Sequence, residues 1–271
     1  MALYRGMDRA ALDAAYNNGA AVGIPKREAY IADWSKRSAA FLAKANAKLD
    51  MRYGDTPRQT LDFFAAAKRG GPTLMFIHGG YWQGGDKEIY RFLAEGPIGR
   101  GINVAFIEYT LAPAIRMDGI VAEIARGVDW LVAHLGEFGA ATNGIVVSGH
   151  SAGGHLTATT LGRPGVLAAL PISGLFDLEP IRLCYLNDKL ALDEAEAKRN
   201  SPILHLPARK PPMVVAVGGG ELPELIRQSK DYAEASGARY LPLAGHDHFS
   251  ILEEMARPDG KLLAALTDHL L

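Results

Sequence analysis

The stretch Gly149-His150-Ser151-Ala152-Gly153 constrains this chain more than any other part of its sequence. It follows the apolar run Ile145-Val146-Val147 and precedes residues 152–161, whose pattern indicates a helix. A serine placed so tightly between a strand and a helix must lie on a very sharp turn. Its neighbours must be small so that the two elements can approach each other. The stretch therefore predicts a strand–turn–helix unit that presents Ser151 at its apex.

A glycine pair follows an earlier apolar run, because His78-Gly79-Gly80-Tyr81-Trp82 comes directly after residues 74–77. Acyl transfer to a serine passes through a tetrahedral oxyanion, which needs preorganised N–H donors, each worth roughly 3–4 kcal/mol. In hydrolases with such a serine turn, one donor follows the nucleophile and the others come from a His-Gly-Gly loop after an early strand. We therefore expect the N–H groups of Gly80 and Tyr81, in preference to Gly79, to form the oxyanion hole with Ala152.

Charge and cysteine content narrow the class of protein. The 271 residues fit one domain, residues 1–271, and 29 Lys and Arg balance 30 Asp and Glu. The net charge of −1 gives no reason to expect nucleic acid or an anionic membrane as a partner. Cys184 is the only cysteine, which rules out a disulfide within the chain and agrees with a reducing compartment.

The amino-terminal region carries no apolar targeting segment. Residues 1–23 include Asp8 and Asp13 without the apolar core of a signal peptide, and no apolar run approaches 18 residues. We therefore expect a cytoplasmic protein that acts on a small-molecule substrate, with no membrane partner. The sequence does not fix the oligomeric state, for which a homodimer is one option.

Short strand-like runs alternate with helical patterns along most of the chain. The runs lie at residues 49–53, 59–64, 74–78, 102–109, 144–148, 167–173, 213–218 and 240–244. Between the fourth and fifth runs, Ile120, Ile124, Val128 and Leu131 recur at helical spacing. Such alternation predicts a mainly parallel sheet with helices on both faces. Together with the serine turn and the glycine loop, it indicates an α/β-hydrolase fold.

Two segments fall outside this rhythm. Residues 1–45 form helical patterns and predict an amino-terminal helical extension over the sheet. Residues 175–206 interrupt the strand pattern, and they form either a small cap over the active site or a long surface crossover. Either choice leaves no room for a large lid, so we expect a small substrate.

The catalytic base should follow the last strand, in the chain order serine, acid, histidine. His246 and His248 both lie just after residues 240–244, and we favour His248 because the apolar stretch 249–252 follows it and would anchor its loop. The trio of residues 246–248, His-Asp-His, could alternatively bind a metal, but no further ligand cluster supports such a site. We therefore expect no metal.

The acid should lie in the loop after residues 213–218, where Glu221 is the first carboxylate. A carboxylate there would hold one histidine tautomer and stabilise the imidazolium that forms as Ser151 attacks. Asp177 and Glu224 remain alternatives. Further competitors are Asp231 and Asp247.

Several of these motifs resemble kynurenine formamidase (arylformamidase) and related small esterases of the α/β-hydrolase superfamily. The resemblance rests on residues 78–82, residues 149–155, residues 173–178, residues 224–229 and the ending His248-Phe249-Ser250, and it runs from about Tyr16 to the carboxyl terminus. It implies a triad of Ser151, Glu221 and His248, with glutamate standing where the family carries aspartate. It also implies aryl formamides of the N-formyl-kynurenine type and simple esters as substrates.

Aromatic residues near the motifs are candidates for the substrate pocket. Trp82, Phe176 and Tyr185 could line it, or they could be ordinary core and surface aromatics. The expected mechanism is two-step acyl transfer through Ser151, without a metal or organic cofactor. The alternatives are a general short-chain carboxylesterase and an inactive binding module on a hydrolase scaffold. The second alternative is disfavoured because the serine, the histidine and the oxyanion glycines are all retained.

Overall fold

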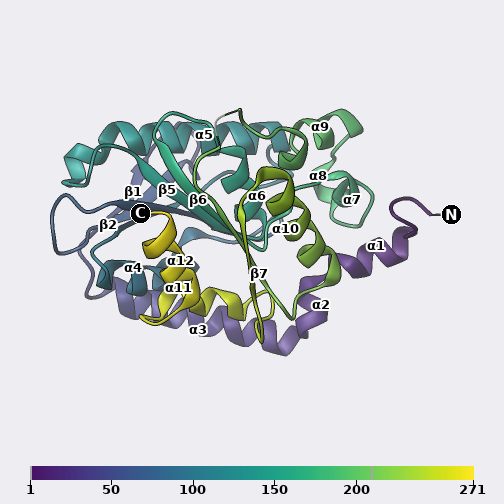
Figure 1. Ribbon diagram of the computed structural model, residues 1–271, viewed down its shortest axis with the longest axis horizontal. Helices are drawn as coiled ribbons and strands as arrows, with labels where there is room; N and C mark the ends of the chain where they lie inside the picture. The colour runs from purple at the N-terminus through teal and green to yellow at the C-terminus, as the bar shows by residue number, and fades with distance from the viewer. Residues whose placement is uncertain (1, 209) are drawn as a thin grey trace.

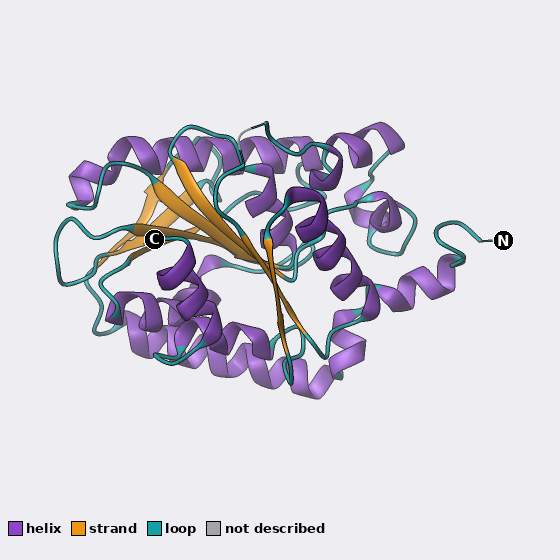
Figure 2. Cartoon of the chain, viewed as in Figure 1, coloured by secondary structure: helices purple, strands orange, loops and turns teal. Residues whose placement is uncertain are grey.

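The computed structural model describes residues 2–208 and 210–271, with an eight-stranded sheet at its centre (Figures 1 and 2). The strands are β1 (Ala47–Arg52), β2 (Thr60–Phe64), β3 (Thr73–Ile77), β4 (Asn103–Ile107), β5 (Ile145–His150), β6 (Val166–Ile172), β7 (Val214–Gly218) and β8 (Arg239–Leu243). Their order across the sheet is β1-β2-β4-β3-β5-β6-β7-β8. The pairs β1–β2 and β2–β4 are antiparallel, and all later neighbours are parallel. The predicted mainly parallel sheet is confirmed, and each strand-like run overlaps one strand.

Helices cover both faces of this sheet. The α-helices are α1 (Arg9–Ala15), α2 (Asn18–Val22), α3 (Ile24–Leu42), α4 (Glu95–Gly99), α5 (Met117–His134), α6 (Ala152–Thr159), α7 (Glu179–Arg182), α8 (Asn187–Leu190), α9 (Glu194–Arg199), α10 (Pro223–Ser236), α11 (Glu253–Ala256) and α12 (Lys261–His269). Short 3-10 helices are η1 (Lys87–Ala94), η2 (Leu135–Phe138), η3 (Pro202–Leu204) and η4 (Ser250–Leu252). Figure 1 shows α5 along one face of the sheet and α3, α11 and α12 on the other.

Each face has its own apolar core. On the α5 side, Ile120, Ile124, Val128 and Leu131 are fully buried, as their helical spacing predicts. On the other side, Trp34 of α3 packs with the apolar residues of α11 and α12. The strands between the two cores, such as β3 and β5, are buried along their whole length. That burial explains why their sequences are apolar without alternation.

The strand order reverses at β3, and this reversal positions the site. Strand β4 follows β3 along the chain and lies on one side of it, whereas β5 lies on the other side. In the parallel pairing of β3 with β5, Ile77 lies opposite Gly149. The segment beginning at His78 and the turn at Ser151 therefore leave the same edge of the sheet side by side. Such a reversal is where open α/β sheets bind their ligands.

Two segments outside the sheet match the sequence expectations in outline. Helices α1, α2 and α3 make up the amino-terminal helical extension, and α3 runs the length of one sheet face (Figure 1). The segment 175–206 forms the short helices α7, α8 and α9 and the 3-10 helix η3. It inserts between β6 and β7, so it interrupts the strand–helix rhythm as predicted.

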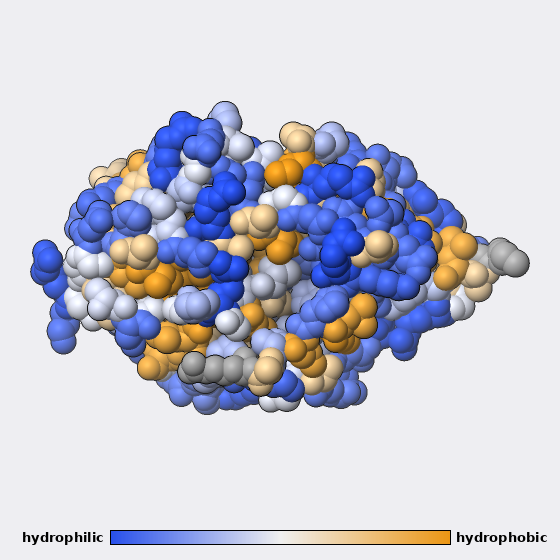
Figure 3. Space-filling view, turned by 90° about the horizontal axis from the view of Figure 1, so that it is seen from above, coloured by the Kyte–Doolittle hydropathy of each residue, from blue (hydrophilic) through white to orange (hydrophobic). Residues whose placement is uncertain are grey.

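Apolar surface is dispersed over the molecule. Polar and charged side chains cover most of the face shown in Figure 3, and apolar side chains form small separate groups there. The exposed large apolar side chains come from different elements, among them Ile24, Leu167 and Leu204. Within residues 2–208 and 210–271, every helix is too short or too polar to cross a lipid bilayer.

Candidate active site

Ser151 lies on a strained turn between β5 and α6. Its φ of 56° and ψ of −117° fall in a region of backbone conformation that residues other than glycine rarely occupy. A Cβ atom on Gly149 would lie 2.4 Å from the carbonyl oxygen of Gly153, and one on Gly153 would lie 2.0 Å from that of Ile77. Only glycine fits at these two positions. The small residues predicted around Ser151 are therefore a steric requirement of the turn.

The loop after β3 coils tightly against Ser151. Gly80, Tyr81 and Trp82 have φ values of 115°, 50° and 58°, so three consecutive residues adopt left-handed backbone conformations. A Cβ atom on Gly80 would lie 2.0 Å from the carbonyl oxygen of Gly84, and one on Gly79 would lie 3.1 Å from the Cβ atom of Ser151. The glycine pair thus allows the loop backbone to approach the serine closely.

His78 anchors the start of this loop through two contacts of its imidazole ring. Its Nδ1 is 2.8 Å from the carbonyl oxygen of Gly79, and its Nε2 is 2.8 Å from Oε1 of the buried Glu108. Arg58 also donates to Glu108, at 2.6 Å. Burial alone would raise the pKa of Glu108, but the contacts with His78 and Arg58 outweigh burial and lower that pKa. Glu108 is therefore a buried carboxylate that holds the base of the loop.

Glu221 and His248 form a buried pair. Oε2 of Glu221 is 2.6 Å from Nδ1 of His248, and both side chains are more than nine-tenths buried. The other carboxylate oxygen accepts hydrogen bonds from the Ser173 hydroxyl and from the Gly218 N–H, the latter at 2.6 Å. With Glu221 accepting, the neutral ring carries its proton on Nδ1, which leaves Nε2 as a proton acceptor. The extra methylene of glutamate does not prevent this contact.

The competing carboxylates have other partners. Asp177 accepts a hydrogen bond from Tyr4 at 2.7 Å, and Glu224 accepts one from Tyr16 at 3.0 Å. Arg227 pairs with both Glu224 and Asp231, at 2.7 Å each. The contact with His248 thus favours Glu221 over these alternatives.

The side chains of residues 246–248 diverge instead of converging on a metal. His246 lies 3.2 Å from Glu254, Asp247 lies 2.8 Å from Lys26, and His248 contacts Glu221. Among the residues described, one cluster of three carboxylates has oxygens close enough together to hold a cation: Asp86, Glu88 and Glu108. Its members already pair with Arg58, Lys87 and His78.

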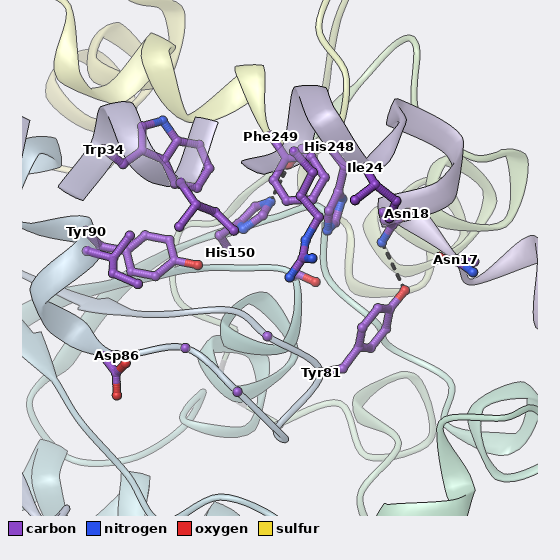
Figure 4. Close-up of a pocket in the computed structure, with 18 of the residues that line it drawn as sticks. Asn17, Asn18, Ile24, Trp34, Tyr81, Asp86, Tyr90, His150, His248 and Phe249 are labelled. Carbon is purple, nitrogen blue, oxygen red and sulfur yellow. Dashed lines mark hydrogen bonds between the residues drawn. The ribbon is translucent and has the colours of Figure 1, made fainter. Parts of the chain in front are cut away.

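Ser151 lines a cavity of about 430 Å³, and Figure 4 labels ten of the residues around it. Ser151, His150 and His248 line it together with Gly80 and Tyr81. The rest of its wall consists of Asn17, Asn18, Gly19, Ile24, Arg27, Ile31, Trp34, Gly84, Gly85, Asp86, Ile89, Tyr90, Tyr185 and Phe249. The structure therefore gathers the predicted nucleophile, base and oxyanion loop around one cavity.

The predictions that Trp82 and Phe176 line the substrate pocket are wrong. Trp82 is fully buried behind the loop, where its Nε1 donates to Nδ1 of His155 at 3.2 Å. Phe176 is also fully buried, with its ring stacked 4.1 Å from that of Tyr232. Both side chains belong to the core because tertiary packing turns them away from the cavity. Tyr185 does line it, as predicted.

The wall of the cavity comes mainly from the amino-terminal extension and less from residues 175–206. Segment 175–206 contributes Tyr185, while its helices are tied to other elements through the pairs Arg9–Asp188 and Arg116–Glu196. The extension instead supplies seven residues between Asn17 and Trp34, six of them on α2 and α3. Sequence reasoning missed this role, although Ile24, Ile31 and Trp34 recur at helical spacing on one face of α3. That stripe was the available signal.

Four contacts, among others, hold this extension over the site. Asn18 donates to the Tyr81 hydroxyl at 2.9 Å, the dashed line in Figure 4, and that hydroxyl donates to the carbonyl oxygen of Tyr16 at 2.6 Å. Lys26 pairs with Asp247 beside the base. At the far end, Trp34 donates to Glu253 at 3.2 Å. The extension is therefore bonded both to the oxyanion loop and to the histidine loop.

Two buried histidines support the turn. Nε2 of His150 is 2.7 Å from the carbonyl oxygen of His248, and burial lowers the pKa of His150 well below its usual value. Nε2 of His155 is 2.8 Å from the carbonyl oxygen of Asn200, and burial lowers the pKa of His155 to about 4. Both rings are therefore neutral at pH 7. Their bonds fix the base loop and the start of α6.

Comparison with known proteins agrees with this geometry. A family model described as BD-FAE matches residues 61–163, which contain the oxyanion loop and the serine turn. The kynurenine formamidase of Salmo salar is 31% identical over 243 residues, covering 82% of this chain and 81% of the fish protein. That of Danio rerio is 31% identical over 76% of each protein. The chain belongs to the kynurenine formamidase family.

A solved structure supports membership of the kynurenine formamidase family. A crystal structure from Silicibacter sp. TM1040, described as a candidate thioesterase, is 32% identical and superimposes with a TM-score of 0.87. The match covers 94% of this chain and 98% of that one. The predicted resemblance and the α/β-hydrolase fold are confirmed, and the protein is a hydrolase.

Proposed function

We propose that Ser151, His248 and Glu221 form a catalytic triad that cleaves small aryl formamides or short-chain esters. The observation that carries this proposal is the 2.6 Å contact between Glu221 and His248, beside the cavity that Ser151 and His248 both line. The strained backbone of Ser151 adds support, because strain of this kind concentrates at functional sites.

The reaction has two steps. Nε2 of His248 takes the hydroxyl proton of Ser151, whose oxygen attacks the substrate carbonyl. Glu221 stabilises the imidazolium that forms. His248 then gives its proton to the leaving amine or alcohol, and the acyl group stays on Ser151. Water activated by His248 cleaves this acyl-serine and restores the enzyme.

The oxyanion would be bound by backbone N–H groups of Gly80, Tyr81 and Ala152. Gly80 and Tyr81 line the cavity beside Ser151, and Ala152 begins helix α6. Donors fixed in this way stabilise the oxyanion without reorganisation during the reaction.

The lining of the cavity favours a substrate with an aromatic leaving group, and a formamide would need only a narrow site for its acyl group. Trp34, Tyr90 and Phe249 lie together on one wall, on the side away from Tyr81 (Figure 4). Family membership points the same way, because the curated relatives are kynurenine formamidases. A short-chain carboxylesterase is the second candidate, since the same groups would cleave an ester with little change.

The test compares N-formyl-kynurenine and formanilide with p-nitrophenyl esters of increasing acyl length. We expect turnover of the formamides, and a fall in kcat/KM of more than tenfold between the acetyl and octanoyl esters, since each methylene in a tight pocket is worth roughly 1–3 kcal/mol. Good acetyl-ester turnover without formamide turnover would favour the carboxylesterase. Flat or rising activity toward octanoyl would contradict a narrow acyl site.

A further inference from the structure

The cavity wall carries a cation that the proposed triad does not use. Arg27 lies in the first turns of α3 and lines the cavity together with Ser151. It belongs to the same helix face as Ile24, Ile31 and Trp34, which line the cavity too. The side chain is therefore directed to the substrate side of the helix.

The charges around the cavity leave Arg27 uncompensated. Asp86 also lines the cavity, but its carboxylate is paired with Arg58 at 3.0 Å. Within residues 2–208 and 210–271, no carboxylate oxygen lies within 4.0 Å of the Arg27 guanidinium, whereas most other arginines of the chain have such a partner. A cation without a partner at the wall of a cavity attracts an anionic ligand group.

The charge of Arg27 reaches both sides of the cavity. Burial raises the pKa of Tyr90 to about 12, and the charge of Arg27 acts against this rise. Burial likewise raises the pKa of Tyr185, again opposed by Arg27. Tyr90 and Tyr185 line the same cavity as Arg27, so the charge of Arg27 acts inside this cavity.

The helix that carries Arg27 adds to the positive potential. Helix α3 has 19 residues, and its N-cap residue, Gly23, has no side chain that could accept a hydrogen bond from the first N–H groups. Its first residue, Ile24, lines the cavity. The amino-terminal end of a helix carries a partial positive charge, which favours a nearby anion. Arg27 and the helix end therefore act in the same direction.

We propose that Arg27 binds a carboxylate on the aromatic leaving group of the substrate. This inference rests on the proposed function, whose candidate substrate N-formyl-kynurenine carries such a carboxylate, and it assigns the recognition of that group to Arg27. The carboxylate is placed on the leaving group because a formyl or acetyl group cannot carry one. The planar guanidinium can bind a carboxylate through two parallel hydrogen bonds, which a lysine cannot do. Arg27 would therefore determine specificity without taking part in bond cleavage.

Matched substrates test this role. We would compare 4-acetoxybenzoate with 4-acetoxybenzamide, which differ in charge but hardly in size, and 3-formamidobenzoate with 3-formamidobenzamide. For the wild-type enzyme we expect kcat/KM to be at least tenfold higher for each anion, chiefly through KM. Raising the salt concentration should reduce this preference, since the pair is partly solvated.

Variants assign the preference to one residue. Arg27→Gln should remove the preference, Arg27→Lys should keep part of it, and Arg27→Glu should invert it. The control is Lys36→Gln, which removes the same charge from an exposed position on the same helix and should leave the preference unchanged.

Two results would overturn the inference. One is an equal kcat/KM for anion and amide in the wild type. The other is an equal loss for both substrates in Arg27→Gln, which would indicate a structural role. Hydrolysis of the neutral amide substrates tests the triad separately. If the wild type cleaves them and Ser151→Ala does not, the proposed function stands whatever Arg27 does.

Discussion

The carboxyl edge of the sheet and the amino-terminal extension both face the cavity, but they are held very differently. At the sheet edge, Glu221 is buried and fixed by His248, Ser173 and Gly218. In the extension, Ile24 at the start of α3 is 50% exposed, and the segment is attached through contacts along its length, among them Asn18 with Tyr81 and Trp34 with Glu253. The difference teaches that the proposed catalytic groups are held by the sheet itself, while the residues of the opposite wall come from a separate, partly exposed segment.

This contrast predicts a division in kinetic behaviour. Changes at the sheet edge should lower kcat, because they act on groups needed only as the transition state forms. Changes in the extension should act mainly on KM. The predictions below test that division, beginning with the largest effect.

The first prediction concerns the nucleophile. Ser151→Ala should lower the turnover of an activated aryl ester by roughly 10⁴–10⁶-fold, since no acyl-serine can form. Circular dichroism and the unfolding midpoint should stay close to those of the wild type. A variant that keeps more than a tenth of the activity would rule out the serine mechanism.

The second prediction concerns the acid. Glu221→Gln should lower kcat by roughly 10²–10⁴-fold, because a neutral amide cannot stabilise the imidazolium of His248. Asp177→Asn and Glu224→Gln are the matched controls and should cost much less, since these carboxylates bond to tyrosines. Steady-state kinetics in which Asp177→Asn is the crippling change would show that the assignment is wrong.

The third prediction concerns the pH dependence of the free energy of unfolding, to which the buried His155 contributes. Burial lowers the pKa of His155 to about 4 in the folded protein. In the unfolded chain this pKa is about 6.5, so the unfolded chain takes up a proton at a higher pH than the folded protein does. The free energy of unfolding should therefore fall by about 3 kcal/mol as the pH falls from 6.5 to 4, in addition to the contributions of other groups.

Urea unfolding between pH 7 and pH 4.5 measures this effect. His155→Gln should unfold more easily at pH 7, because the bonds to Trp82 and Asn200 are weakened. It should also show a shallower dependence on pH over this range. Equal slopes in the two proteins would mean that His155 is not the titrating group.

The fourth prediction, the smallest, concerns the attachment of the extension. Tyr81→Phe removes the hydroxyl that joins the oxyanion loop to Asn18 and Tyr16. We expect KM to rise up to about tenfold, since the lost hydrogen bonds contribute roughly 1 kcal/mol. The value of kcat should change less than twofold. A large fall in kcat with constant KM would show that the wall and the catalytic groups are not separable.

Much of the fold and the chemistry was predictable from the sequence, because local patterns specify them. The turn at Ser151 needs glycine at 149 and 153 for steric reasons, and the buried strands need continuous apolar runs. Chain order then placed the acid after one strand and the base after the next. The Glu221–His248 contact fits that placement.

The wall of the cavity was less predictable, because tertiary packing decides which way an aromatic side chain turns. Trp82 directly follows the oxyanion loop, yet its indole enters the core to meet His155. Phe176 stacks on Tyr232, which is far away in the sequence. Conversely, Arg27 belongs to no motif, and only the path of α3 across the cavity brings it near Ser151.

The most direct test of the central claim is covalent labelling with a fluorophosphonate, followed by peptide mass spectrometry. We predict one adduct per chain, on Ser151, because His248 and Glu221 make this hydroxyl nucleophilic. The Ser151→Ala variant should remain unlabelled, and Glu221→Gln should label far more slowly. An adduct on another residue, or full ester activity in a chain that takes up no label, would contradict the account.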